Sequence, residues 1–551
     1  MRRALTIILA VSAIAFARVP EHKSGTIAIM QAVREGRSIS SMAMRPSLPY
    51  FYDTPEGNFR IHYDLAGHNA VDSVGYVHKM GEYLEYCWDF YIDTLGYLPP
   101  PLEDLPDGGG RHQVYLRNIS AYGQVWPTGD GPQDWIDWTS YMEIDNNFND
   151  VYPNDDPEGP VAGAMKVTCA HEFHHVIQYG LRGTSGAWIA ELTSVYYEER
   201  IYPQVNDYVW LIDYLSSNPE QPLDWESGYH MYGLGIFAQY MAEAAGDEFL
   251  VSVWDTMRFM PDWQALETMS DIYYHGLDLL LANFSARALL IGSRDDGFFP
   301  DGALLSDMRV ETTHRTYPAS GTSTNRPYGY GMNFVVFEGI PTEDCDLEIS
   351  FNGSPSASWF VRAIWKSRDS VQIFDAIDGD TTGVIVVPFA NRADFVGLSI
   401  VPIGDTRTRY LYSYSADIVP ANIAERPVPR DFSIRAYPNP FNASVTISIE
   451  SDGAIHELPQ HVEIYDLAGR RVDVIANSGQ PVIARSTATR NLAQYDEISR
   501  SARNDSETVM EELAPSHKYE TTWSPPEHFS SGLYFIRVGE SRSLYPITLL
   551  K

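Results

Sequence analysis

Cysteine is scarce in this sequence, which has only Cys87, Cys169 and Cys345 in 551 residues. No two of them show the Cys-x-x-Cys spacing of metal and redox sites, and three thiols cannot all pair with one another. This excludes a small scaffold held together by disulfides. The chain must rely on core packing, which its 44% hydrophobic and 13% aromatic residues make possible. At roughly 100–200 residues per domain, the length predicts about three to five domains.

Positive charge is also in short supply. The sequence has 39 Lys and Arg against 73 Asp and Glu, which gives a formal net charge of −34. A surface of this sign repels phosphate backbones and anionic lipids. We therefore expect no nucleic-acid partner.

Long uncharged hydrophobic runs are absent after residue 17. The best later candidate, Leu277–Ile291, contains Asp278 and Arg287. At the N-terminus, a short basic start is followed by an apolar run over 4–17. This run is shorter than the ~20 residues of a membrane-spanning helix. This pattern predicts a secretory signal peptide over 1–17. We expect a secreted or cell-surface protein with no transmembrane anchor after its removal.

The pattern of apolar residues changes several times along the remaining chain, which predicts a multidomain protein. Strand-like segments mixed with helical periods indicate an α+β domain, and later runs of short apolar segments separated by turns indicate two all-β sandwich domains. The predicted segments are the signal peptide 1–17, a leader or propeptide 18–45, the α+β domain 46–306, a β-sandwich 307–418, a proline-marked linker 419–431 and a second sandwich 432–551 with a polar insertion at 476–519.

The most informative motif is an H-E-x-x-H pattern that begins at His171 and ends at His175. It lies in a predicted helix, Ala164–Tyr179, that Gly180 is placed to end. The i, i+4 spacing puts both imidazoles on one helix face, where they can bind one zinc ion. Glu172 would then act as the general base that takes a proton from a zinc-activated water. The alternative is a helix whose histidines are merely packed or exposed.

A catalytic zinc needs a third protein ligand and an open position. The metzincin pattern would continue with glycine and histidine where this sequence has Gln178 and Leu181, so that class is excluded. A second predicted helix begins at Trp188, and an antiparallel return would bring Glu191 to the zinc. A carboxylate between apolar Trp188 and Leu192 is costly to bury unless it has a partner, and a metal ion would be one. A buried salt bridge to an arginine is the alternative.

Two other acidic residues of this second helix, Glu198 and Glu199, are rival ligands. Each is more easily read as a charge on a solvated helix face. The additional histidine His174 lies beside His175 and points elsewhere, so we expect it to pack or to support the ligands.

These motifs resemble the gluzincin metallopeptidases, and more specifically the secreted bacterial peptidases of the Myxococcus-type metalloprotease group. The resemblance covers about residues 50–292 and is carried by Phe59–Tyr63, Ser140–Asn146, Thr168–His175 and Trp188–Glu191. It implies a zincin-like fold, with His171, His175 and Glu191 as zinc ligands and Glu172 as general base. The shorter spacing to the third ligand departs from thermolysin.

Peptidases of this class usually hold the substrate backbone on an edge strand before the zinc helix, and Tyr141–Asp145 is the candidate here. An ordinary sheet strand is the alternative. Tyr229, His230 and Tyr232 open the next helix with donors near its N-terminus. Of these we select Tyr229 and His230 as candidates for stabilising the oxyanion of the transition state.

Oxygen-bearing side chains are dense just before the zinc helix, as Ca²⁺ would require. They are Asp145, Asn146, Asn147, Asn149, Asp150, Asn154, Asp155 and Asp156. A twelve-residue EF-hand loop is not evident, so a solvated turn is favoured over a calcium site.

The final stretch resembles the type IX secretion sorting domain, which has an immunoglobulin-like fold. Its motifs are Tyr437–Asn442, Ile464–Arg470 and Ser531–Phe535, and the long insertion departs from the pattern. The resemblance implies the type IX secretion machinery as a partner. An adhesive or structural β-module is the alternative.

Together these patterns predict a secreted zinc metalloendopeptidase that acts on protein or peptide substrates. The alternative from another class is a cell-surface adhesion or binding protein with an inactive or structural zinc site. A zinc hydrolase acting on a non-peptide bond is a third possibility.

Overall fold

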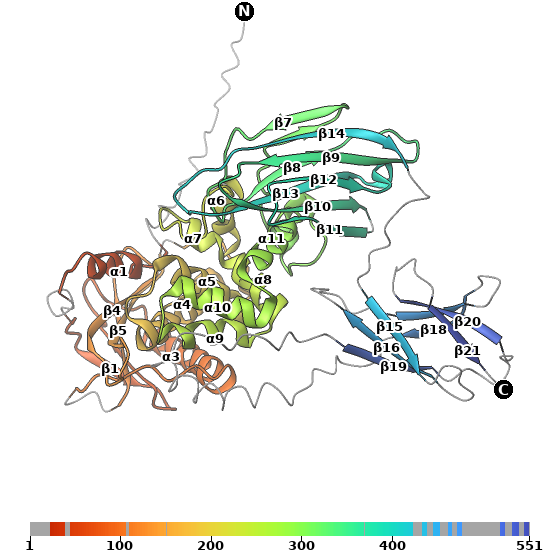
Figure 1. Cartoon of the computed structure of the whole chain (residues 1–551). Helices are drawn as coiled ribbons and strands as arrows, with labels where there is room; N and C mark the ends of the chain where they lie inside the picture. Colours follow the sequence, from red (N-terminus) through yellow and green to blue (C-terminus); the bar gives the residue numbers. More distant parts are fainter. Residues whose placement is uncertain are drawn as a thin grey trace, which may run out of the picture. The chain divides into compact units, whose positions relative to one another are not determined.

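The computed structural model describes residues 23–38, 45–105, 110–149, 151–368 and 370–421, and the backbone of the strands beyond residue 431. The chain divides into two compact units, Met1–Ala421 and Asn422–Lys551 (Figure 1). Their border falls inside the segment predicted to be a linker, most of which lies outside the described residues. The predicted signal peptide also lies outside them.

The first unit opens with a mixed five-stranded sheet in the order β1-β2-β3-β5-β4. Its strands are β1 (Tyr50–Asp53), β2 (Phe59–Tyr63), β3 (His112–Arg117), β4 (Gly123–Asp130) and β5 (Trp138–Asp145). Strands β2, β3 and β5 run parallel, whereas β4 pairs antiparallel with β5 and forms an edge of the sheet. The predicted substrate strand, β5, is therefore an interior strand, and that prediction is wrong.

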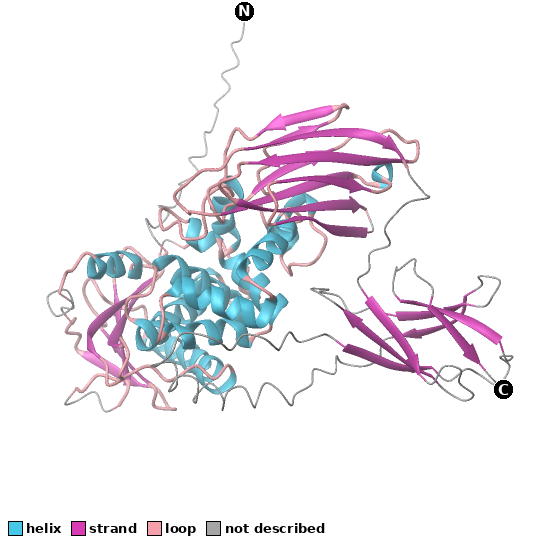
Figure 2. Ribbon diagram, in the orientation of Figure 1, coloured by secondary structure: helices cyan, strands magenta, loops and turns pink. Residues whose placement is uncertain are grey.

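Helices cover this sheet and continue to the sandwich that follows (Figure 2). They are α1 (Thr26–Arg34), α3 (Val74–Trp88), α4 (Pro160–Arg182), α5 (Ala187–Ile201), α6 (Ile212–Ser217), α7 (His230–Gly233), α8 (Gly235–Ala245), α9 (Glu248–Met257), α10 (Asp262–Tyr274) and α11 (Leu277–Ala288). Helix α4 contacts both β4 and β5, and α11 contacts the sandwich. The first unit is thus α+β.

Helix α4 is buried along nearly its whole length, because it passes through the centre of the core. It begins at Pro160, whose missing N–H suits a first helical position. Gly180 lies inside the helix and does not end it, contrary to prediction. A Cβ atom there would lie 2.7 Å from Pro101 and 3.2 Å from Pro100 Cα, so glycine is needed for this close packing.

The leader predicted over 18–45 contains an ordered helix, α1, within the described residues 23–38. Its side chains Ile27, Ile29, Met30 and Ala32 are buried, and the helix contacts β4 and α5. This part of the leader is therefore packed against the first unit, because these apolar side chains are removed from water on folding.

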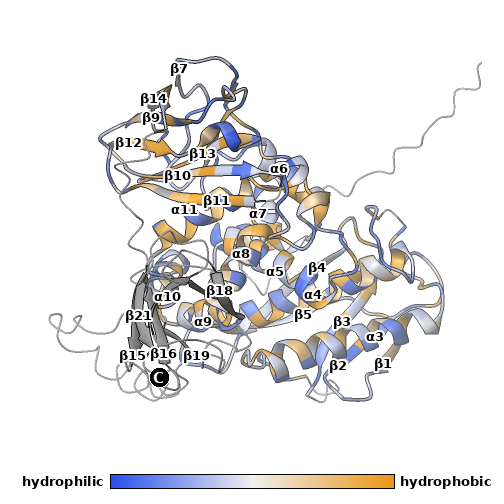
Figure 3. Ribbon diagram, turned by 90° about the vertical axis from the view of Figure 1, so that its right-hand side faces the viewer, coloured by the Kyte–Doolittle hydropathy of each residue, from blue (hydrophilic) through white to orange (hydrophobic). Residues whose placement is uncertain are grey.

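Two facing sheets form the sandwich of the first unit, in the orders β11-β10-β13-β8-β6 and β12-β9-β14-β7. The strands are β6 (Thr312–His314), β7 (Ala319–Thr322), β8 (Asn333–Phe337), β9 (Cys345–Gly353), β10 (Ser358–Ser367), β11 (Ser370–Asp378), β12 (Thr382–Val387), β13 (Phe395–Ile403) and β14 (Tyr412–Pro420). Hydrophobic residues recur along these strands and along the helices of this unit (Figure 3). Trp359, Leu398 and Tyr412 are among the buried side chains of the sandwich core.

Arg362 joins the sandwich to the helices. Its side chain is 1% exposed, and its Nε donates a hydrogen bond to Asn283 Oδ1 of α11 at 2.7 Å. On the other side its guanidinium forms an ion pair with Asp378, with N and O 2.6 Å apart. The buried cation is therefore paired, as a charge removed from water must be.

The second unit contains two antiparallel sheets, in the orders β15-β16-β19 and β18-β17-β20-β21. The strands are β15 (Phe432–Tyr437), β16 (Val445–Ser451), β17 (His461–Tyr465), β18 (Arg471–Ala476), β19 (Lys518–Trp523), β20 (Gly532–Val538) and β21 (Tyr545–Leu549). The predicted insertion lies outside the described residues except for its ends, in β18 and β19. Across all the described residues, no helix combines the length and the apolar character needed to cross a membrane.

Candidate metal centre

Three predicted ligands meet between α4 and α5. His171 and His175 lie one turn apart on α4, and their Nε2 atoms are 3.0 Å apart. Glu191 of α5 approaches both, with Oε2 at 3.0 Å from His171 Nε2 and Oε1 at 3.2 Å from His175 Nε2. All three side chains are at most 2% exposed.

The spacing of these atoms suits a small tetrahedral ion. With metal–ligand distances of about 2.1 Å, tetrahedral geometry separates neighbouring ligand atoms by about 3.4 Å. Both oxygens of Glu191 are buried, and within the described part of the chain they have no hydrogen-bond donor beyond the two imidazoles. Burial opposes ionisation, but His175 and His171 lower the pKa of Glu191 to about 2. This lowering comes from protonated imidazoles, and a metal ion bound between neutral imidazoles would supply the positive charge in their place.

Two further side chains orient the imidazoles from behind. His171 Nδ1 lies 2.6 Å from Glu198 Oε1, and His175 Nδ1 lies 2.6 Å from Gln178 Oε1. Gln178 is fixed in turn, because its Nε2 donates to Ala190 O at 3.0 Å. With both Nδ1 atoms donating, both Nε2 lone pairs face the centre, as metal ligands require.

Glu198 and Glu199 differ from the prediction of solvated charges, because both are buried. The burial of these two residues cannot be read from the sequence, because it arises from other elements that surround α5 on nearly all sides. Glu198 supports His171, as described above. Glu199 faces Asp301, and burial and that neighbour raise its pKa to about 9. His174 packs as expected, with its ring stacked 5.3 Å from that of Tyr91.

The predicted general base, Glu172, lies beside this cluster with a side chain 1% exposed. Burial raises its pKa, while His175 and His171 act in the opposite direction. At the start of β4, Gly123 leaves room for it, since a Cβ atom there would lie 2.4 Å from Glu172 Cγ. Thr26 of the leader donates its hydroxyl proton to Glu172 Oε2 at 3.0 Å.

The leader also pairs with the outer edge of β4. Gly25 N donates to Gly123 O at 2.9 Å, and Tyr122 N donates to Lys23 O at 3.0 Å. Val125 N then donates to the Thr26 hydroxyl at 2.8 Å. The segment from Lys23 to Thr26 therefore lies along the sheet edge, directly beside the metal centre.

Neither predicted oxyanion candidate has a described contact with the metal ligands. Tyr229 packs among aromatic rings, 4.8 Å from that of Tyr214. His230 is buried, and burial lowers its pKa to about 4. Tyr232, one turn along, stacks its ring 6.2 Å from that of His171 and accepts a 3.4 Å hydrogen bond from Ser24 N. Of these three residues, Tyr232 is the one whose ring is stacked on that of a predicted metal ligand.

The oxygen-rich segment before α4 forms hydrogen-bonded turns. This favours the predicted turn over a calcium site. Asp145 accepts from Phe148 N at 2.7 Å, and Asp156 pairs with Lys166 Nζ at 2.8 Å. Asp150 lies outside the described residues. Among the described His, Cys, Asp and Glu residues, the group able to hold a metal ion is His171, His175 and Glu191.

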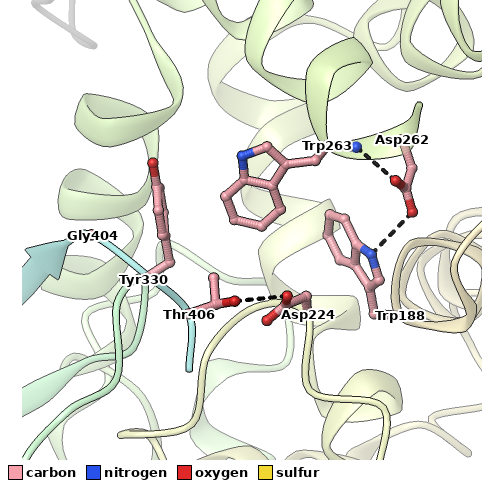
Figure 4. Close-up of a pocket in the computed structure, with 7 residues that line it drawn as sticks. All are labelled: Trp188, Asp224, Asp262, Trp263, Tyr330, Gly404 and Thr406. Atoms are coloured by element: carbon pink, nitrogen blue, oxygen red, sulfur yellow. Dashed lines mark hydrogen bonds between the residues drawn. The ribbon is translucent and has the colours of Figure 1, made fainter. Parts of the chain in front are cut away.

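A separate cavity of about 410 Å³ lies between the helices and the sandwich (Figure 4). Asp262 Oδ2 accepts hydrogen bonds from Gly186 N at 3.1 Å and from Trp188 Nε1 at 3.2 Å. On the sandwich side, Thr406 donates to Asp224 at 2.9 Å. The side chains of Asp262, Trp188, Thr406 and Asp224 are thus already hydrogen-bonded within the protein.

Comparison with known proteins identifies the C-terminal part of the chain. Residues 435–495 match the family model described as a secretion system C-terminal sorting domain. This supports the predicted type IX sorting domain and its engagement of the secretion machinery. The predicted localisation, secreted or at the cell surface, is confirmed. No curated protein matches the chain.

Among solved structures, the chain is similar to the glycoside hydrolase domain Endo-D from Streptococcus pneumoniae R6. The match covers 42% of this chain and 32% of that one, with 10% sequence identity and a TM-score of 0.13. The chain thus spans about a third of that protein's length. Similarity this weak carries no argument about fold or function.

Proposed function

We propose that the protein is a secreted zinc-dependent endopeptidase with a zincin-like catalytic domain. The observation that carries the proposal is the convergence of His171, His175 and Glu191, with their ligand atoms 3.0–3.2 Å apart. Two neutral imidazoles and one carboxylate form the usual protein ligand set of a hydrolytic zinc site. When bound, zinc supplies a Lewis acid that polarises a carbonyl and makes water acidic near neutral pH.

The protein's own groups have distinct tasks in this reaction. Glu172 holds the water and accepts its proton at a carboxylate oxygen, then delivers that proton to the leaving amine. Glu198 and Gln178 keep the imidazoles in the tautomer that binds metal. The phenol of Tyr232 donates a hydrogen bond to the oxygen on which negative charge develops.

The edge of β4 supports a peptide as the substrate. Its outward backbone groups bind the segment from Lys23 to Gly25, and a substrate chain could pair with them once that segment is displaced. Because Gly123 lies against Glu172, a peptide added to this edge would present its bonds to the general base.

The test must first displace the leader, because Thr26 binds Glu172. Residues 35–38 are exposed, and they can be replaced by the recognition sequence of a specific protease, so that the full chain folds before it is cut. The cut, zinc-loaded protein is incubated with a mixed peptide library, and bound zinc is measured by elemental analysis. Glu172→Gln is treated in parallel.

We expect one bound zinc in both proteins and peptide cleavage by the unsubstituted one alone. One zinc in both without any cleavage would overturn the peptidase and favour a binding protein with a structural zinc site. Cleavage by both would show that Glu172 is not the base.

A further inference from the structure

Lys23 is an unusual residue for a leader, because its charged side chain is buried at 2% exposure. Its Nζ forms an ion pair with Asp207 Oδ2 at 2.6 Å and a second, shorter one with Glu198 Oε2. The side chains of Asp207 and Glu198 are at most 1% exposed. The ammonium group of Lys23 is thus enclosed between two buried carboxylates, those of Glu198 and Asp207, which together are called the acidic pocket here.

This pocket requires a cation. Two carboxylates removed from water and placed around one point are strongly unfavourable unless a positive charge lies between them. Asp207 Oδ1 is also buried, and no donor for it is found among the described residues. The pocket therefore has one more acceptor than the two that Lys23 uses here, and the planar fork of a guanidinium could reach it.

The pocket also lies where a substrate side chain would reach. Lys23 is followed by Ser24, which bridges to Gly123 on the sheet edge, and by Thr26, which binds Glu172. Glu198 connects the pocket to the metal centre, because its other oxygen contacts His171 Nδ1. A chain added to β4 can thus place one side chain in the pocket while its backbone passes the general base.

We propose that Glu198 and Asp207 form a subsite for a basic side chain of the substrate, lysine or arginine, and that Lys23 occupies this subsite in the intact chain. The proposal rests on the proposed peptidase function. It gives the leader a second role, since Lys23 and Thr26 together block the subsite and the general base until the segment leaves.

Peptide cleavage tests the subsite directly. The cut, zinc-loaded full chain is given matched peptides that differ at one position, with lysine or norleucine and with arginine or citrulline. We expect kcat/KM to be about tenfold or more higher for the charged member of each pair, as for other buried charge pairs. Asp207→Asn should reduce this ratio, whereas Asp72→Asn, at an exposed position, should leave it unchanged.

Binding provides a readout that needs no catalysis. A labelled peptide of residues 23–34 is titrated into the cut protein after its own segment has been washed out. We expect the peptide carrying Lys23→Met to bind at least about tenfold more weakly. In the uncut chain, Lys23→Met should raise the rate of cleavage of an added peptide.

The outcomes separate the two proposals. Cleavage without a basic preference, with equal binding of both labelled peptides, overturns the subsite and leaves the peptidase in place. Tighter binding of the Lys23 peptide without cleavage of any substrate supports the cation pocket and overturns the peptidase. If Asp207→Asn does not fold, as judged by its melting temperature, the two labelled peptides still decide.

Discussion

The hydroxyl of Thr26 and the carboxylate of Glu172 form a 3.0 Å hydrogen bond across 146 positions of sequence. The same hydroxyl accepts a 2.8 Å hydrogen bond from Val125 N on the sheet edge. Thr26 therefore links the leader to the proposed base and to the proposed substrate strand at once. A water molecule activated by Glu172 would need the oxygen that Thr26 now occupies.

We expect Thr26→Val to weaken the hold of the leader on Glu172 and β4. The substitution keeps the shape but removes the hydroxyl, and it leaves Val125 N without its partner, a loss of about 1–3 kcal/mol. The uncut chain should then cleave peptides about five- to a hundredfold faster than the unsubstituted uncut chain. Thr26→Ser retains the hydroxyl and serves as the control. Equal rates for the two variants would argue against this role of the hydroxyl.

Zinc affinity should depend on Glu198 although it is not a ligand. Glu198→Gln removes the charge that holds His171 in its metal-binding orientation. Loss of such a supporting group typically costs about 10- to 100-fold in metal affinity. Competition with a chromophoric chelator measures this. The matched control is Glu199→Gln, a neighbouring buried carboxylate that faces Asp301, and it should bind zinc like the unsubstituted protein.

Catalysis should distinguish Tyr232 from Tyr229. Removing one donor to a developing oxyanion lowers kcat by about 10²–10³. In the cut protein we therefore expect Tyr232→Phe to lower kcat with little change in KM, and Tyr229→Phe to retain activity. A fall in kcat for Tyr229→Phe alone would restore the assignment made from the sequence.

Stability should fall with rising pH because of Glu199. Its pKa is about 9 in the folded protein against an ordinary value of 4.5, so the folded state retains a proton that the unfolded state releases. The free energy of unfolding is therefore lost as pH rises from about 4.5 to 9, by at most about 1.4 kcal/mol per pH unit. Glu199→Gln should flatten this fall in urea titrations at pH 5 and 8. Glu82→Gln, at an exposed position, should reproduce the slope of the unsubstituted protein.

Local spacing carried much of what the sequence revealed about the metal centre. The i, i+4 histidines and the apolar neighbours of Glu191 are properties of single helices, and their convergence needs only a short turn between α4 and α5. The strand order was not available in this way. That β4 and not β5 forms the edge depends on pairing between segments distant in sequence, which periodicity does not record.

Other features escaped because they depend on tertiary burial. Glu198 and Glu199 look like the exposed face of a helix, yet α5 is enclosed on nearly all sides. Lys23 lies in a polar stretch with weak periodicity, and only the fold pairs it with Asp207. The one available signal was the short apolar pattern of Ile27 and Met30, which the polar surroundings obscure.

The three proposed metal ligands all belong to one stretch of 21 residues, from His171 to Glu191. Binding an ion there closes only a short loop, and the entropy lost on closure grows slowly with loop length. Under the proposed function, the α4–α5 hairpin can therefore bind zinc before distant strands have paired. Chelation should loosen this hairpin first, so that amide hydrogen exchange rises in α4 and α5 while the sandwich stays protected.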